Sequence, residues 1–121
     1  MASEQIINYF LKVKFPYNIN VFTTKNGCQT LKESKVFRSQ VESIKEERER
    51  MFAALSGIEQ IVQVFPSQAN FLLFRCPQAS QVYLRLLEKG IVVRDRSSLF
   101  GLEDCIRVSV GTSDENKLFL K

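Results

Sequence analysis

The chain has 121 residues, with 17 Lys and Arg against 13 Asp and Glu, which gives a net charge of +4. This length allows one domain with its own hydrophobic core and excludes two domains of ordinary size. Because the chain has no histidine, a His-containing zinc site, a Ser-His-Asp triad and a Cys-His dyad are all excluded. The 3 cysteines form no CxxC pair, so we expect neither a disulfide framework nor a metal site.

The sequence predicts no membrane or secretory segment. No apolar run approaches the roughly 18 residues that a membrane span needs. The N-terminus also lacks a basic segment followed by an apolar stretch. The basic residues are interleaved with acids, as in residues 45–50, whereas nucleic-acid-binding proteins gather them on one face. We therefore expect a soluble, cytoplasmic protein that binds neither a membrane nor nucleic acid.

The first third of the chain predicts helices. Apolar residues recur there at helical spacing, namely Ile6, Ile7, Phe10, Leu11 and Val13. Ser3 is placed as an N-cap, and Pro16 should end the helix because proline removes a backbone donor. Residues 17–34 contain Gly27 and several Thr and Asn residues, yet we expect at least one short helix there.

The strongest pattern in the sequence is a long amphipathic helix that begins near Lys35. Spacings of four and three residues place one set of side chains on a single face: Phe37, Val41, Ile44, Arg48, Met51 and Leu55. The aliphatic stem of Arg48, the one charged member, can cover apolar surface. Gly57 is well placed to end the helix as its C-terminal cap.

The second half of the chain predicts strands. Four apolar segments are typical of strands: residues 61–65, 70–76, 91–94 and 106–110. The second of them is too apolar for an edge strand and is expected to be central. Residues 78–89 predict a helix that Gly90 stops, and Thr112 and Glu115 form a capping-box pattern for a last helix starting near Ser113. This order predicts an α+β fold, in which helices cover one face of a small, mostly antiparallel sheet preceded by the long helix.

Two arginines are candidate anion ligands. Arg94 ends the third predicted strand, and Arg107 lies inside the fourth, on the face opposite to Ile106 and Val108. A charge inside a strand must be solvated or paired, and the guanidinium fork suits a carboxylate or a phosphate. The pattern alone also allows Arg107 to pair with an acid or reach solvent, and it allows Arg94 to lie in a solvated loop.

An ordered set of segments covers nearly the whole chain. The segments are Pro16-Tyr17-Asn18, Glu47-Arg48-Glu49-Arg50, residues 66–74 (PSQANFLLF), residues 89–95 (KGIVVRD) and residues 105–112 (CIRVSVGT), with Glu115-Asn116 just behind. Together they resemble the C-terminal part of the histidinol-phosphate aminotransferase family, whose members are fold-type-I pyridoxal-phosphate enzymes. The resemblance implies that residues 1–34 form a linker helix and interdomain segment and that residues 35–121 form the C-terminal small domain.

The resemblance also implies a reaction and a site. Family members transfer an amino group between glutamate and imidazole-acetol phosphate in histidine biosynthesis. Arg94 and Arg107 match the family's anion-binding arginines, which hold the substrate's phosphate or the carboxylate of glutamate. Tyr17 and Asn18 match the stretch between the two domains and are further substrate-binding candidates.

The chain departs from the family in what it lacks. The Schiff-base lysine, the aspartate that pairs with the cofactor ring and the phosphate cradle all lie upstream in the family, and nothing here matches them. We therefore expect no catalytic residue in this chain and no pyridoxal phosphate bound to it. As an isolated fragment it should be an inactive monomer that needs the missing N-terminal large domain, whereas the full enzyme should be a homodimer with pyridoxal phosphate.

Other functions fit the same residues. A related aminotransferase or a threonine-phosphate decarboxylase must also hold an amino compound that carries an anion. A stand-alone module that binds a phosphorylated metabolite or a protein partner is an alternative of a different class. Titration with histidinol phosphate against inorganic phosphate would separate selective binding from a bare anion site.

Overall fold

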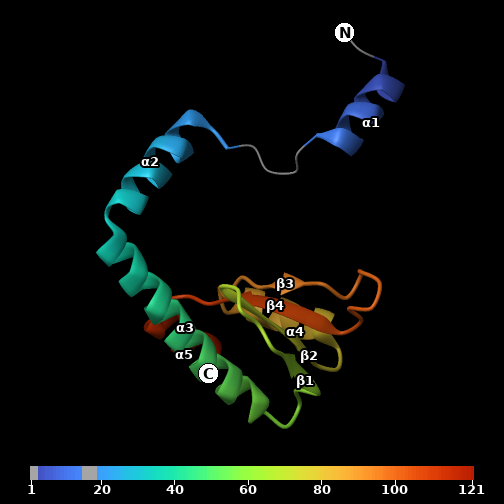
Figure 1. The fold of residues 1–121 in the computed structure, drawn as a ribbon. Helices are drawn as coiled ribbons and strands as arrows, with labels where there is room; N and C mark the ends of the chain where they lie inside the picture. Colours follow the sequence, from blue (N-terminus) through green and yellow to red (C-terminus); the bar gives the residue numbers. More distant parts are fainter. Residues whose placement is uncertain (1–2, 15–18) are drawn as a thin grey trace. The chain divides into compact units, whose positions relative to one another are not determined.

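The computed structural model describes residues 3–14 and 19–121, which divide between two compact units, residues 1–37 and 38–121. In chain order the elements are α1 (Glu4–Val13), α2 (Val21–Lys32), α3 (Ser34–Ser56), β1 (Gln63–Phe65), β2 (Phe71–Arg75), α4 (Ala79–Glu88), β3 (Arg94–Asp95), β4 (Cys105–Ser109) and α5 (Ser113–Phe119) (Figure 1). No helix in the described part of the chain is long and apolar enough to cross a membrane.

The first unit contains the two predicted N-terminal helices. Ser3 precedes α1 in an extended conformation, although its side chain makes no capping hydrogen bond. The short helix expected within residues 17–34 is α2, and the Asn20 side chain caps it by accepting a hydrogen bond from the Thr23 amide at 2.8 Å. Neither helix buries a residue within its own unit. Pro16, Tyr17 and Asn18 lie outside the described residues.

The long helix α3 confirms the strongest prediction from the sequence. The predicted apolar face becomes buried toward the C-terminal end, where Met51 and Leu55 are each 1% exposed. Arg48 lies on the same face with its side chain 13% exposed, and its Nη1 donates to the Ala69 carbonyl oxygen at 3.2 Å. After the helix, the Gly57 amide donates to the Ala53 carbonyl oxygen at 3.2 Å, so the helix ends where predicted.

The sheet has the order β1-β2-β4-β3, and every neighbouring pair is antiparallel. The prediction that the second strand is central is confirmed, because β2 pairs with both β1 and β4. The prediction of a third strand at residues 91–94 is wrong in its bounds. Gly90 turns the chain at φ +76°, and the Ile91 amide still donates to the Leu86 carbonyl oxygen of α4 at 2.9 Å. The chain therefore reaches the edge of β4 only at Arg94.

Helices cover one face of this sheet, as predicted for the α+β fold. Alternate residues of the two central strands point to that face, where they are buried: Leu72, Phe74, Ile106 and Val108. They share one hydrophobic core with Met51 and Leu55 of α3 and Ala79 of α4. From α5, the Phe119 ring packs on Phe74 with 6.3 Å between the ring centroids.

The connection from β4 to α5 is fixed by polar contacts. The predicted capping box is present, since the Thr112 amide donates to Glu115 Oε2 at 2.8 Å and the Glu115 amide donates back to Thr112 Oγ1. Asn116 is only 4% exposed and binds both the amide and the carbonyl oxygen of Gly111. Its Nδ2 also donates to Glu47 Oε2 at 2.8 Å, which ties α5 to α3. These contacts hold the end of the strand that carries Arg107.

Candidate functional site

The open face of the sheet, which we define by Phe71, Leu73, Arg94, Arg107 and Ser109, lies opposite the helix-covered face. In the strand register Arg107 pairs with Leu73 on one side and with Arg94 on the other. Directly paired residues of antiparallel strands point to the same face, with their Cβ atoms about 5 Å apart. The structure therefore brings the two arginines singled out in the sequence side by side.

Two like charges directly opposite each other destabilise a sheet unless something lies between them. The ion pairs within residues 3–14 and 19–121 involve neither Arg94 nor Arg107. No acidic side chain in that part of the chain thus forms an ion pair with either of the two arginines. An anion held by both guanidinium groups would offset their repulsion and use their forked donors.

The two arginines differ in their surroundings. Arg94 is exposed, whereas Arg107 is partly buried. The Cζ atom of Arg107 lies 4.9 Å from the centroid of the Phe71 ring. Its Nε is buried and has no hydrogen-bond partner among the described residues. A buried donor left without an acceptor costs about 1–3 kcal/mol, so the Nε of Arg107 is a hydrogen-bond donor that the described residues leave unsatisfied.

Asp95 fixes the short strand that carries Arg94. Its side chain points to the opposite face, toward α4, where Ser80 Oγ donates to Oδ2 at 2.6 Å. The Ser97 amide donates to Oδ1 at 2.8 Å. Hydrogen bonds from Ser80 and then from Ser97 hold the pKa of the Asp95 carboxyl below its usual value, since they stabilise the charged form. Sequence reasoning assigned no role to Asp95, although its alternation with Arg94 along a strand was the available signal.

Arg75 illustrates an arginine on the same side of the sheet whose hydrogen bonds are already made. Its Nε donates to the Glu103 carbonyl oxygen at 3.1 Å and its Nη2 to the Gly101 carbonyl oxygen at 3.2 Å. Its Cζ atom also lies 5.8 Å from the Phe65 ring centroid. Arg75 thus braces the loop before β4, and its donors are engaged in a way that those of Arg107 are not.

The residues of this chain do not fit pyridoxal phosphate by themselves. A lysine that forms a Schiff base must present a neutral amine, which proteins obtain by removing it from water or placing it beside another cation. Every lysine of the chain is exposed. Tyr17 and Asn18 lie outside the described residues, so their place near the substrate stays a prediction. Within the described ranges no cluster of three or more metal-ligating side chains occurs.

The fold agrees with what comparison of the sequence shows. The family profile for aminotransferase class I and II matches residues 1–121, and the chain belongs to this family. Among curated relatives, the histidinol-phosphate aminotransferase of Flavobacterium johnsoniae is 36% identical over 120 residues, which are 99% of this chain and 34% of that protein. The histidinol-phosphate aminotransferase of Aquifex aeolicus is 40% identical over 123 residues, covering 100% of this chain and 34% of its own length.

Solved structures show the same relationship. The histidinol-phosphate aminotransferase from Clostridium acetobutylicum matches with a TM-score of 0.75 and 30% identity, covering 97% of this chain and 36% of that one. A decarboxylase from Sulfurospirillum multivorans matches with a TM-score of 0.71 and 32% identity over 98% of this chain and 32% of its own. The chain thus spans about a third of the length of the relatives it matches.

Proposed function

We propose that this chain is the substrate-binding small domain of a pyridoxal-phosphate aminotransferase that transfers an amino group between glutamate and imidazole-acetol phosphate. Arg94 and Arg107 hold the anionic group of each substrate. The observation that carries the proposal is the direct pairing of these two cations on the open face, with no acid partner among the described residues.

The chemistry of transamination supports this assignment. The enzyme accepts two unlike substrates in turn, and both carry an anion near the carbon that bears the amine. Two forked donors bind either a carboxylate or a phosphate. When bound by the rest of the enzyme, pyridoxal phosphate supplies the aldehyde that accepts the amino group. The arginines contribute by orienting the substrate, and such positioning is worth several kcal/mol of a reaction barrier.

The remaining assignments follow from the same proposal. Residues 1–34 are the linker helix and interdomain segment, and residues 35–121 are the small domain. The partner of this chain is the large, cofactor-holding domain, which corresponds to the two thirds of its relatives that the chain does not match. The chain alone binds no pyridoxal phosphate and is inactive and monomeric, whereas the full enzyme is a cytoplasmic homodimer.

A complementation assay tests the proposal. The chain replaces the matching third of the Flavobacterium johnsoniae enzyme, either fused to the remaining two thirds or mixed with them, and glutamate-dependent transamination of imidazole-acetol phosphate is followed. Arg94→Ala and Arg107→Ala are measured in parallel. Arg85→Ala is the matched control, because Arg85 is exposed on α4 and its loss removes the same charge far from the open face.

Each outcome has a distinct meaning. Activity that requires the chain, survives Arg85→Ala and falls at least tenfold with either of the other alanines supports the family role and the site together. If neither Arg94→Ala nor Arg107→Ala lowers the activity, the proposed anion site is wrong, but the proposed role in the aminotransferase stands. Absence of activity in a chimera that co-purifies as one complex and binds pyridoxal phosphate refutes the proposed substrate.

Decarboxylation of a phosphorylated amino acid is a second candidate function. The match to the decarboxylase from Sulfurospirillum multivorans, at 32% identity over 98% of this chain, favours it. An arginine pair that holds a phosphate serves this reaction equally well, since threonine phosphate also carries an anion and an amine. Release of carbon dioxide from threonine phosphate by the same chimera, without transamination, would favour the decarboxylase.

A further inference from the structure

Phe71 stands against the guanidinium group of Arg107 on the open face. It pairs with Ser109 in the register, two residues from Arg107 along β4, so the two side chains are diagonal neighbours on the same side of the sheet. The Cζ atom of Arg107 lies 4.9 Å from the ring centroid, within the range in which an aromatic face attracts a cation. The guanidinium group therefore lies over the ring, at a distance where the two attract each other.

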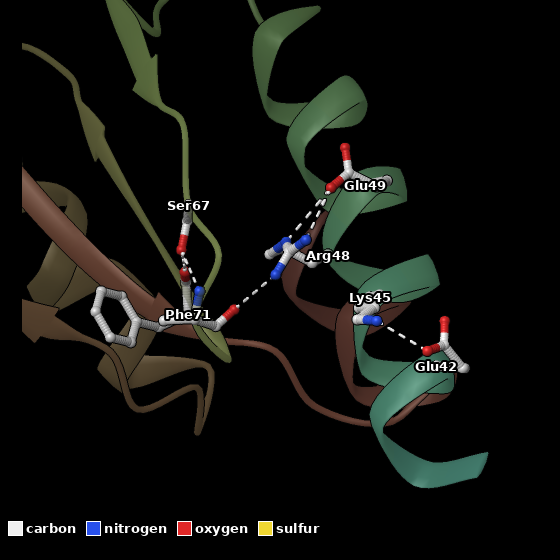
Figure 2. Close-up of polar contacts among 7 residues, drawn as sticks. Glu42, Lys45, Arg48, Glu49, Ser67 and Phe71 are labelled. Atoms are coloured by element: carbon white, nitrogen blue, oxygen red, sulfur yellow. Dashed lines mark hydrogen bonds and ion pairs between the residues drawn. The ribbon is translucent and has the colours of Figure 1, made fainter. Parts of the chain in front are cut away.

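The position of Phe71 is fixed by the turn that precedes β2. Ser67 Oγ donates to the Phe71 carbonyl oxygen at 2.7 Å and accepts from the Ala69 amide at 3.1 Å. Arg48 reaches across from α3 and donates to the Ala69 carbonyl oxygen at 3.2 Å (Figure 2). On the far side of the turn, the Val110 amide of the chain leaving β4 donates to the Asn70 carbonyl oxygen at 2.8 Å. The backbone that carries the ring is thus braced from both the helix and the neighbouring strand.

A role in the hydrophobic core does not account for this phenylalanine. Phe71 points away from the helices and is absent from the core cluster of the described residues, which takes Leu72 and Phe74 from the same strand. A partly buried ring on the open face contributes less to folding than a core residue does. On that face the ring contacts the arginine that lacks an acceptor for its Nε among the described residues.

We propose that Phe71 is the positioning residue of the anion site, and this inference rests on the proposed function. Its ring holds the guanidinium of Arg107 in place on the open face, where its N–H donors reach an anion shared with Arg94. Without the ring, repulsion between the two arginines would turn Arg107 away from the site. Fixing the side chain beforehand reduces the rotamer entropy lost on binding, which strengthens binding without any added contact to the ligand.

The test compares three variants of the full 121-residue chain. Phe71→Leu removes the aromatic face, Phe71→Tyr keeps it, and Phe65→Leu is the matched control, since Phe65 stands over Arg75 instead. The first readout is the arginine Nε–H signal of Arg107 in a nitrogen-15 spectrum, assigned by its loss in Arg107→Lys. The second readout is the dissociation constant for inorganic phosphate, measured by following the same spectrum during titration.

Phe71→Leu should move the Arg107 Nε–H signal and weaken phosphate binding about 3- to 10-fold, the range that a cation–π contact supports. Phe71→Tyr and Phe65→Leu should leave both readouts near wild type. The wild-type chain provides a test that needs no substitution, because the Phe71 ring current must displace the Arg107 side-chain signals upfield. If no such displacement is seen, the inference is overturned even where Phe71→Leu does not fold.

The two proposals fail in different ways. If wild type binds phosphate no better than Arg107→Lys, the anion site of the proposed function is wrong, and the positioning role has no ligand to serve. If wild type binds phosphate and Arg107→Lys does not, yet Phe71→Leu binds as wild type, only the role of Phe71 is overturned.

Discussion

The two faces of the sheet differ in burial and in charge. On the helix-covered face, Leu72, Phe74, Ile106 and Val108 are at most 5% exposed and contact one another and three helices. On the open face, Arg94 and Arg107 are paired directly, and the buried Nε of Arg107 has no partner in the described part of the chain. The first face is packed within the chain, whereas we propose that the second receives an anion from outside. A mutation on the first face should therefore change stability, and one on the second should change binding.

The largest expected effect comes from the helix-covered face. Ile106→Ala removes three carbon atoms from a fully buried site, and such truncations cost about 2–5 kcal/mol of unfolding free energy. Ser109→Ala, on the open face of the same strand and exposed, should change it by less than about 0.5 kcal/mol. Urea denaturation of both variants measures the difference. Equal losses would mean that the open face is also covered in solution.

Asn116→Ala should give the next largest effect. The substitution leaves the partly buried backbone groups of Gly111 without their partners and removes a hydrogen bond to Glu47, which together cost about 1–3 kcal/mol. Lys117→Ala is the neighbouring control, since Lys117 is exposed on the same helix. The measurement is again the urea midpoint. An unchanged midpoint would show that the connection from β4 to α5 is not held by Asn116.

Asp95→Asn should cost about 1 kcal/mol at neutral pH, because the amide replaces a charged acceptor of two hydrogen bonds. The folded pKa of Asp95 is lowered, so its contribution is complete above the ordinary aspartate pKa of about 4 and is lost as the pH falls through the lower folded value. Between about pH 7 and pH 2, the melting temperature of the variant should thus fall less steeply than that of the wild type. If the melting temperatures of wild type and variant fall in parallel with pH, Asp95 does not stabilise β3 through its charge.

The smallest effect, and one of opposite sign, is expected for Arg94→Ala without ligand. Removing one of two facing cations relieves their repulsion, so the unfolding free energy should stay level or rise by up to about 0.5 kcal/mol. Inorganic phosphate should raise the melting temperature of wild type but not of this variant. A clear destabilisation by Arg94→Ala would show that the arginine serves the fold, and the contrast between the two faces would disappear.

The sequence alone was sufficient for the helices and for most of the strands, because their signals are local. The spacing of Val41, Ile44, Met51 and Leu55 predicts a helix whatever it packs on, and the capping box at Thr112 and Glu115 needs only four residues. The third strand was misplaced for the same reason. The apolar residues at 91–94 predicted a strand there, whereas the hydrogen bond from the Ile91 amide to α4 holds the chain away from β4, so that pairing begins only at Arg94.

The sequence by itself determined that Arg107 lies inside a strand, on the face opposite Ile106. It placed Arg94 at the end of another strand, whereas Arg94 begins β3. Only the tertiary structure decided that the two are direct partners and that the guanidinium of Arg107 lies over the Phe71 ring. Register between strands depends on turns and on a core shared by residues far apart in the chain, and a shift of one residue would turn Arg94 to the other face. The pairing of charges on which the proposed site rests is therefore a property of the fold, not of any single segment.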